Sequence, residues 1–436
     1  MTTLAEVRLW DRTIGAVSVE DGSDIAAFQY DPAFLRSGIE VAPLHLPLNA
    51  SPYRFPNLNQ DSFHGLPGLL ADSLPDRYGT ALIDAWLAGQ GRSPDSANAV
   101  ERLCYTGRRG TGALEFEPAR PPAPSPSQDI EIAGLVKLAS EVLSERKQLS
   151  TSLSGGQDEQ AMRDILSVGT SAGGARAKAV IAWNPETDAI RSGQLEAGPG
   201  FDHWLLKFDG VTENKDREDL ADPQGYGAIE YAYSLMARDA GIDMADCRLL
   251  EENGRRHFMT RRFDRTGDDK VHMLSLAAMA HFDFAQAGAF AYEQAFMVIR
   301  QLGMDTRAVE QQFRRAVFNV LARNQDDHVK NIAFLMDRSG RWSLSPAFDL
   351  AYAYNPSGDW TARHQMSLNG KLGDFTRADF GALARTGMLK RNRGTRIFEE
   401  VLDVVAAWPD YAARAGLPEN DRERIERALR LSLPMS

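Results

Sequence analysis

"NQDDHVKN" (324–331) places seven polar side chains among eight residues, between the apolar-patterned stretches "AVFNVLAR" (316–323) and "IAFLM" (332–336). Two adjacent carboxylates, a histidine, a lysine and two asparagines therefore lie where the chain should be entering a core. Buried polar groups need partners, so the segment is either a solvated loop or a functional site built into the interior. Taken alone, it favours neither interpretation.

The composition limits the classes of protein to which the chain can belong. A length of 436 residues predicts two or three domains, and 43% hydrophobic and 25% charged residues are typical of globular proteins. The net charge of −11 argues against direct, non-specific binding to nucleic acid or to an anionic membrane. Without an apolar run long enough to span a membrane or a signal-peptide pattern, the chain is expected in the cytoplasm. Cys104 and Cys247 form no C-x-x-C motif, which excludes a disulfide framework or a cysteine-rich zinc site.

A proline-rich stretch gives the clearest boundary along the chain. "PARPPAPSPSQD" (118–129) contains five prolines in twelve residues, a density that sustains neither a helix nor a sheet ladder. We therefore predict an N-terminal subdomain, a linker, a mixed lobe and a mainly helical lobe, over residues 1–118, 119–129, 130–264 and 265–436.

Local patterns predict elements within these parts. In the first part, "AEVRLWDRTIGAVSVE" (5–20) alternates as an antiparallel hairpin does, and "RGTGALEFEP" (109–118) indicates a strand. In the mixed lobe we predict strands over 177–183 and 203–209, a helix over 228–242, and a hairpin that turns at Asn253-Gly254. "RRFDR" (261–265) is either a hinge between lobes or an exposed edge strand.

Two features before the polar segment could bind phosphate. "SVGTSAGGARAKAVIAW" (167–183) lacks the Walker A spacing, but its glycines would let backbone N–H groups approach an anion, with Arg176 or Lys178 supplying charge. An ordinary Gly/Ser loop is the alternative. Lys207 ends an apolar strand, where it either extends its charge to the surface or pairs with a phosphate, and Glu230 is a possible ionic partner.

The polar segment itself has a kinase-like spacing. Asp326 and Asn331 match the D-x-x-x-x-N of a protein-kinase catalytic loop, where Asp orients the attacking hydroxyl and Asn binds magnesium. Asp349 follows after an apparent hairpin, so Asn331 and Asp349 could converge on one Mg²⁺. His328 is either a base or a side chain that hydrogen-bonds to backbone. The absence of an H-E-x-x-H motif argues against a zinc hydrolase.

The motifs and their order resemble the HipA family of bacterial toxin kinases from type II toxin–antitoxin modules. The resemblance covers nearly the whole chain. Its motifs are "GLPGLLADSLPDRYG", "GTGALEFEP", "TSAGGARAKAVI", "LLKFD", "EYAYSLMARDAGI", "RRFDR", "NQDDHVKNIAFL" and "LSPAFDLAY". It implies an α+β, bilobal protein-kinase fold with a small β-containing N-terminal subdomain, a mixed α/β N-lobe and an all-helical C-lobe.

The resemblance also implies roles for individual residues, with ATP and Mg²⁺ as cofactors. Asp326 would be the catalytic aspartate, Asn331 and Asp349 the magnesium ligands, and Lys207 a phosphate-binding lysine. Ser171, with Thr170 as a second acceptor, would be autophosphorylated, which switches such kinases off. The remaining nucleotide-binding residues would be Ser171, Gly173, Gly174, Ala175, Arg176, Lys178, Phe263, His328 and Lys330.

The sequence departs from the family pattern at two positions. Asp327 stands where many members carry glycine, and it could either raise the pKa of Asp326 or contact a second metal. Arg261 occupies a position that is often acidic in relatives. The hinge is therefore expected to contact adenine only through its backbone.

The resemblance implies partners as well. Family members are usually neutralised by a small HipB-like helix-turn-helix antitoxin, so operator DNA would be reached only through that antitoxin, and no membrane is involved. The expected substrate is a Ser/Thr of a cellular protein, such as an aminoacyl-tRNA synthetase. A silent antitoxin-binding co-repressor and a small-molecule kinase are the alternatives. All four of Lys207, Asp326, Asn331 and Asp349 are present, which favours an active enzyme.

Overall fold

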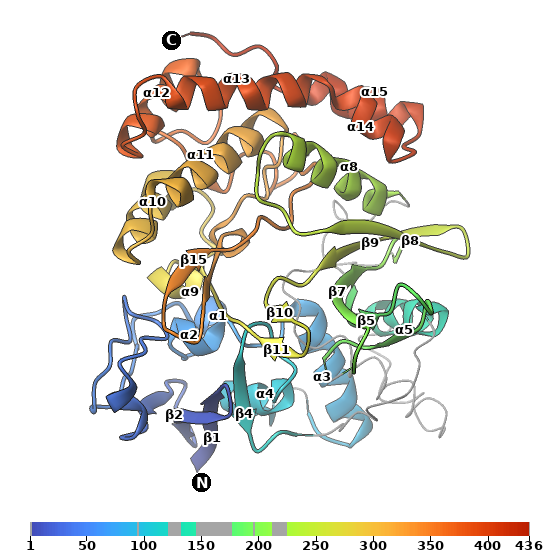
Figure 1. Cartoon of the computed structure of the whole chain (residues 1–436). Helices are drawn as coiled ribbons and strands as arrows, with labels where there is room; N and C mark the ends of the chain where they lie inside the picture. Colours follow the sequence, from blue (N-terminus) through green and yellow to red (C-terminus); the bar gives the residue numbers. More distant parts are fainter. Residues whose placement is uncertain are drawn as a thin grey trace.

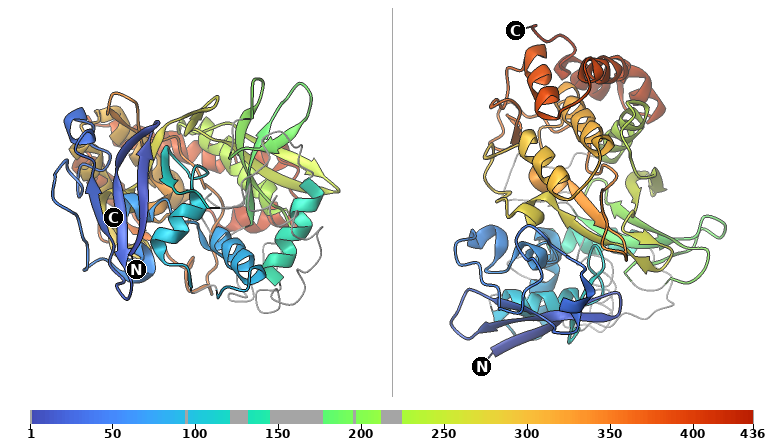
Figure 2. Two further views of the ribbon diagram at one scale, coloured as in Figure 1. Left: turned by 90° about the horizontal axis from the view of Figure 1, so that it is seen from below. Right: turned by 60° about the vertical axis from the view of Figure 1, so that its left-hand side comes forward.

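The computed structural model describes residues 2–93, 96–120, 132–144, 177–194, 197–211 and 225–435, which form three parts. An N-terminal part with its own sheet lies at one end of the molecule, and a mainly helical part forms the other (Figure 1). A five-stranded sheet lies between them, to one side. The N-terminus and the C-terminal helices are at opposite ends in the right-hand view of Figure 2 as well. The predicted α+β class is confirmed.

The N-terminal part is built on the predicted hairpin. Strands β1 (Thr2–Leu9) and β2 (Arg12–Glu20) pair antiparallel, and Trp10 and Asp11 turn the chain with positive φ. Strand β3 (Ala27–Tyr30) pairs with β2, and β4 (Leu114–Glu117), the strand predicted near residue 114, pairs with β1. The helical segments of this part are η1 (Phe34–Ser37), α1 (Gln60–Phe63), α2 (Gly68–Ala71), α3 (Arg77–Gly89) and α4 (Ala99–Thr106).

The five-stranded sheet has the order β6-β5-β7-β9-β8. Its strands are β5 (Lys178–Trp183), β6 (Ile190–Ser192), β7 (Asp202–Lys207), β8 (Cys247–Glu252) and β9 (Arg255–Arg261). Asn253 and Gly254 join β8 to β9 with φ of 45° and 76°, as the predicted tight turn requires. Helix α5 (Ile132–Ser144) shares a core with β5 and β7, and α8 (Tyr226–Asp239) packs against β8 and β9. The antiparallel register of β5 and β7 places Lys178 directly opposite Lys207.

Helices dominate the last part, as predicted. They are α9 (Leu276–Ala280), α10 (Tyr292–Gln301), α11 (Thr306–Leu321), η4 (Val329–Asn331), α12 (Arg377–Thr386), α13 (Arg393–Ala406), α14 (Trp408–Arg414) and α15 (Glu419–Ala428). Asp305 caps α11 by accepting a hydrogen bond from the Ala308 N–H, as its position before the helix favours.

This part is nevertheless not entirely helical. Its strands are β10 (Arg265–Thr266), β11 (Asp269–Lys270), β12 (His272–Ser275), β13 (Phe290–Ala291), β14 (Ala333–Met336), β15 (Trp342–Leu344) and β16 (Met366–Ser367). The predicted hairpin is formed by β14 and β15, and β12 pairs with the free edge of β14. A two-stranded hairpin is marginally stable alone, which explains why a third strand completes it.

The N-terminal part shares its hydrophobic cores with both other parts. Buried residues of its sheet, such as Phe28, belong to one cluster with Phe334 of β14. Helix α3 contributes Trp86 to a second cluster, which also contains Leu135 of α5 and Ile181 of β5. Within the described residues, the first 118 residues therefore pack as an integral part of the molecule. Of the predicted linker, only residues 119 and 120 lie within the described residues.

In the "RRFDR" segment Arg262 and Asp264 are buried, and β9, which ends at Arg261, pairs with both β7 and β8, so the interpretation as an exposed edge strand is wrong. Asp264, 3% exposed, accepts hydrogen bonds from Arg262 (2.5 Å and 2.8 Å), from Arg265 (2.8 Å) and from the Gly112 N–H (2.7 Å). Arg265 also donates to the carbonyls of Gly110 and Gly112, both at 2.9 Å. Gly112 has a φ of 70°, and a Cβ there would lie 2.9 Å from the Met273 nitrogen, so a side chain would not fit.

Candidate active site

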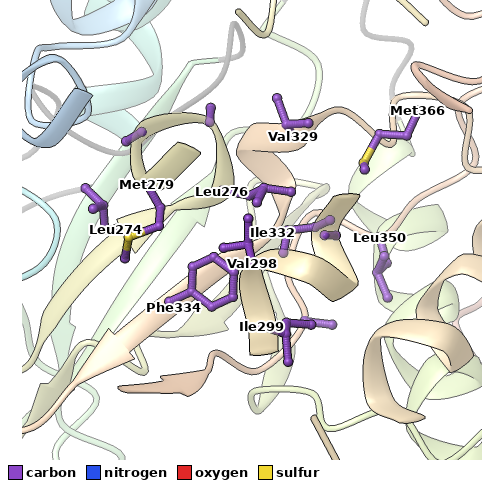
Figure 3. Packing of buried hydrophobic residues seen from close by; sticks show 14 of the residues in the cluster. Leu274, Leu276, Met279, Val298, Ile299, Val329, Ile332, Phe334, Leu350 and Met366 are labelled. Atoms are coloured by element: carbon purple, nitrogen blue, oxygen red, sulfur yellow. The ribbon is translucent and has the colours of Figure 1, made fainter. Parts of the chain in front are cut away.

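The polar segment lies between α11 and β14, and its residues are buried or half-buried. Asn324, Gln325 and Asp327 are at most 3% exposed, and each is hydrogen-bonded within the protein. The apolar residues of the same loop, Val329 and Ile332, belong to the hydrophobic cluster shown in Figure 3. A solvated loop is therefore the wrong interpretation. The loop is anchored by apolar side chains and presents selected polar ones.

Asp326 is the carboxylate that this loop exposes, with 39% of its side chain accessible. Its Oδ1 accepts a hydrogen bond from the Trp360 indole N–H at 2.6 Å, and the His328 Nε2 lies 3.8 Å from the same oxygen. Desolvation raises the pKa of Asp326; His328 opposes this shift, and the neighbouring charge of Asp349 adds to it. The side chain of Asn331 donates to the Asp326 carbonyl at 2.9 Å, which fixes the backbone of the loop.

Lys207 and Asp349 meet beside Asp326. The Lys207 Nζ lies 2.5 Å from the Glu230 Oε1 and 2.5 Å from the Asp349 Oδ1, so the predicted ion pair with Glu230 is present. Burial alone would lower the pKa of Lys207, but attraction to Asp349 and Glu230 outweighs it and raises that pKa. For Asp349, burial is likewise outweighed by Lys207, and the pKa is held far below its usual range. Asp349 has a φ of 56°, a conformation that aspartate tolerates better than most residues.

Lys178 is held by the N-terminal part. Its side chain is 2% exposed, and its Nζ lies 2.9 Å from the Asp76 Oδ2. Asp76 also caps α3 through the Gly79 N–H at 2.7 Å, which fixes the carboxylate against the sheet. Lys178 contributes to the lowered pKa of Asp349, so both lysines place positive charge near this aspartate.

A second carboxylate of the N-terminal part supports the other side of the site. Asp72 accepts hydrogen bonds from the Ser275 N–H and hydroxyl, both at 2.8 Å. Ser275 caps α9, and the Leu276 N–H donates to the Ile332 carbonyl at the end of the polar loop. Asp72 therefore connects the N-terminal part to Ser275, next to the polar loop, and Asp76 connects it to Lys178 of β5.

Three further residues predicted to bind nucleotide have the following positions. Phe263 packs against Phe348, the neighbour of Asp349, with ring centroids 5.6 Å apart. The Lys330 Nζ lies 4.2 Å from the Phe284 ring centroid. The His328 Nδ1 is buried and has no hydrogen-bond partner among the described residues.

The predicted phosphate loop lies outside the described residues. This applies to Ser171, Gly173, Gly174, Ala175, Arg176 and the acceptor Thr170, whereas Lys178 is described.

Asp327 is not a second metal ligand. Both of its carboxylate oxygens accept hydrogen bonds from protein donors in the interior, and its side chain is fully buried. Burial would raise its pKa, but His364, Tyr292 and the Gln365 N–H outweigh this and lower it. Asp327 does raise the pKa of Asp326, as one of the sequence interpretations expected, although as the smallest of the causes.

The arrangement fits a magnesium–nucleotide complex. No group of three or more His, Cys, Asp or Glu that could hold a metal occurs in the described part of the chain, which argues against a protein-only metal centre there. Mg²⁺ is instead commonly held by one or two protein oxygens together with phosphates. The Asn331 amide nitrogen is used by the Asp326 carbonyl, which leaves its Oδ1 as an acceptor, and Asp349 supplies a carboxylate.

Some residues of the site carry no sequence signal. Trp360 and His364 lie in a segment that no motif marks, and only the fold brings them to the loop. Asp72 and Asp76 do lie in the quoted motif "GLPGLLADSLPDRYG", but its spacing says nothing about Ser275 or Lys178.

Comparisons with known proteins identify similar domains and relatives. The family model described as "HipA-like C-terminal domain" matches residues 170–408, and "HipA N-terminal domain" matches residues 5–117. Two proteins of Sinorhizobium fredii, named "Putative kinase Y4dM" and "Putative kinase Y4mE", are 30% and 25% identical over 42% and 34% of the chain. These matches span 45% and 33% of the relatives' own lengths.

A solved structure shares the fold. It is HipA of Shewanella oneidensis MR-1, in complex with HipB and operator DNA, with a TM-score of 0.67 and 17% identity over 97% of this chain and 94% of that one. In the residues that the structure describes, no helix is both long and apolar enough to cross a bilayer.

Proposed function

The chain belongs to the HipA family, and on this basis we propose that it is a Mg-ATP-dependent serine/threonine protein kinase, the toxin of a HipA–HipB-type module. The observation that carries the proposal is the cluster of Lys207, Glu230 and Asp349 next to the exposed carboxylate of Asp326. A lysine oriented by two carboxylates, beside a third that solvent can reach, provides both a phosphate-binding and a hydroxyl-binding group.

In this proposal Asp326 binds the acceptor hydroxyl. The carboxylate accepts the hydroxyl proton as the hydroxyl oxygen bonds to the γ-phosphorus of ATP. The bond from that phosphorus to the bridging oxygen breaks, and ADP leaves. The Trp360 hydrogen bond keeps one carboxylate oxygen oriented, which leaves the other oxygen for the substrate.

Lys207 and Lys178 provide positive charge for the phosphates. Phosphate oxygens would compete with Asp349 for the Lys207 ammonium, while Glu230 keeps the side chain in place. Bound Mg²⁺, held by Asn331 and Asp349, would neutralise charge on the phosphates. Phe263, His328 and Lys330 complete the proposed nucleotide site.

We further propose that residues 171–178 bind the phosphates of ATP and are the chain's own regulatory substrate. A phosphate on Ser171, or on Thr170, would repel the phosphates of ATP unless basic groups rearranged around it. Autophosphorylation would therefore oppose the binding of ATP and inactivate the enzyme.

The proposed partners follow from the toxin assignment. A HipB-like antitoxin would bind this chain and link it to operator DNA, since a net charge of −11 does not favour direct contact with DNA. The growth-arresting substrate would be a cytoplasmic protein such as an aminoacyl-tRNA synthetase. The silent co-repressor alternative is disfavoured because Lys207 and the site carboxylates are all in place.

The test is incubation of cell lysate with γ-labelled ATP, Mg²⁺ and the purified chain. We expect label on one or a few lysate proteins, and on the chain's own peptide that contains Thr170 and Ser171. The matched control is the Asp326→Ala variant, which should give neither signal. Label that enters only a small metabolite would support a small-molecule kinase, and equal labelling by both proteins would contradict the proposal.

A further inference from the structure

Asp327 is the carboxylate that the proposed reaction does not use, and it lies buried directly behind Asp326. It is 3% exposed, and its Oδ2 accepts hydrogen bonds from the Tyr292 hydroxyl at 2.6 Å and the His364 Nδ1 at 2.8 Å. Its Oδ1 accepts from the Gln365 N–H at 2.8 Å. A carboxylate with both oxygens occupied can neither bind metal nor take up a proton easily, so its contribution is to position other groups.

His364 connects this carboxylate to a cation. It is 1% exposed, and the Arg430 NH1 donates to its Nε2 at 2.7 Å. A guanidinium can only donate, so Nε2 must carry a lone pair and the ring proton must be on Nδ1, where it bonds to Asp327. The imidazole is thereby held in one tautomer and one orientation, between a cation and an anion.

Arg430 anchors the outer end of this chain of contacts. It lies just after α15, and its NH2 donates to the Gln325 Oε1 at 3.0 Å, while its NH1 also lies 3.1 Å from the Val320 carbonyl. One side chain therefore contacts the end of α11, the polar loop and His364.

A second series of hydrogen bonds connects Asp327 to the Asp326 carboxylate. The Gln365 side chain donates to the Trp360 carbonyl, and the Trp360 indole N–H donates to the Asp326 Oδ1 at 2.6 Å. Together with the peptide bond between Asp326 and Asp327, these contacts form a closed ring. The backbone and the carboxylate of Asp326 are held by the same short segment, residues 360–365.

We propose that Arg430 and His364 are positioning residues, which act through Asp327 and residues 360–365 to hold the Asp326 carboxylate where the acceptor hydroxyl must meet it. The inference rests on the proposed kinase function, since it concerns the same carboxylate. None of these residues contacts the reacting atoms. Transfer depends steeply on alignment, because a misplacement of about 1 Å can cost on the order of a hundredfold in rate.

The test compares Arg430→Met with Arg427→Met. Both substitutions remove a guanidinium and keep most of the aliphatic stem, but Arg427 lies on the exposed face of α15 and pairs with Glu423 at 3.3 Å. For Arg430→Met we expect kcat to fall roughly tenfold or more, given the alignment dependence above, with an unchanged KM for ATP because the Lys207 cluster is untouched. Amide hydrogen exchange should accelerate in residues 324–332 and 360–366. Arg427→Met should change neither quantity.

Arg430→Lys retains one donor for His364 and should recover part of kcat. If Arg430→Met changes neither kcat nor amide hydrogen exchange, the inference is overturned. It is also overturned if hydrogen exchange accelerates across the whole chain and kcat and KM change together. If the wild-type chain transfers no phosphate, the proposed function fails, but hydrogen exchange still tests whether Arg430 positions the loop. Acceleration confined to residues 324–332 and 360–366 supports that role, and no acceleration overturns it. If Arg430→Met does not fold, Arg430→Lys and His364→Asn serve for the same comparison.

Discussion

Replacing Asp326 with asparagine is expected to lower the rate of phosphoryl transfer about 10²–10⁴-fold, the usual contribution of a general base. Asparagine is close in shape and can still accept the hydrogen bond from the Trp360 indole, so the loop should keep its conformation. It cannot take up the hydroxyl proton. Affinity for ATP should change little, because Lys207 and its two carboxylate partners remain. Label transfer into protein measures the rate, and circular dichroism checks the fold.

Asp337→Asn is the matched control for this variant. Asp337 lies in the loop between β14 and β15, is 43% exposed, and pairs with Arg341 at 3.1 Å, so it has no role in the site. Its substitution should leave the transfer rate unchanged. A rate in Asp326→Asn that stays within a factor of a few of wild type would contradict the assignment of Asp326 as the proton acceptor.

Replacing Asp264 with alanine is expected to lower the free energy of unfolding by about 3–5 kcal/mol, as removal of one partner from a buried ion pair usually does. The guanidinium groups of Arg262 and Arg265 would remain buried without their shared carboxylate, and the Gly112 N–H would lose its acceptor. Urea unfolding measures the effect. Asp269→Ala is the control, because Asp269 is 75% exposed and should shift stability by less than about 0.5 kcal/mol.

The contribution of Asp264 should also depend on pH. Burial alone would raise its pKa, but Arg262 and Arg265 outweigh burial and hold the pKa far below the usual value for aspartate. A lowered folded-state pKa means that the stabilisation is complete at neutral pH and is lost as pH falls below about 4, the unfolded value. The stability difference between wild type and Asp264→Ala should therefore narrow in acid, and an equal difference at pH 7 and pH 3 would contradict this account.

The elements that could be predicted from the sequence are those encoded locally. The turn at Asn253-Gly254, the first hairpin and the helix that carries Glu230 follow from nearest-neighbour patterns, and the structure has all of them. The ion pair of Lys207 with Glu230 could be anticipated as well, because a strand followed by a helix packed on it brings their side chains together.

The residues that could not be predicted are those brought together by tertiary contacts. Trp360 lies 34 residues from Asp326, and no pattern in between indicates that the indole returns to the carboxylate. The sequence predicts that Lys178 binds phosphate but does not indicate its ion pair with Asp76, which forms because the N-terminal part packs against the sheet. The hairpin of β14 and β15 is predicted from the sequence, but the pairing of β12 with β14 is not, since these two strands are far apart in the sequence.

The most direct measurement of the central claim is a crystal structure of the wild-type chain with Mg²⁺ and a non-hydrolysable ATP analogue. We predict that the analogue's phosphates contact Lys207, that Asn331 and Asp349 ligate the Mg²⁺ ion, and that Asp326 faces the terminal phosphate. A nucleotide bound elsewhere, with Lys207 still paired to both Glu230 and Asp349 as in the structure described above, would contradict the account.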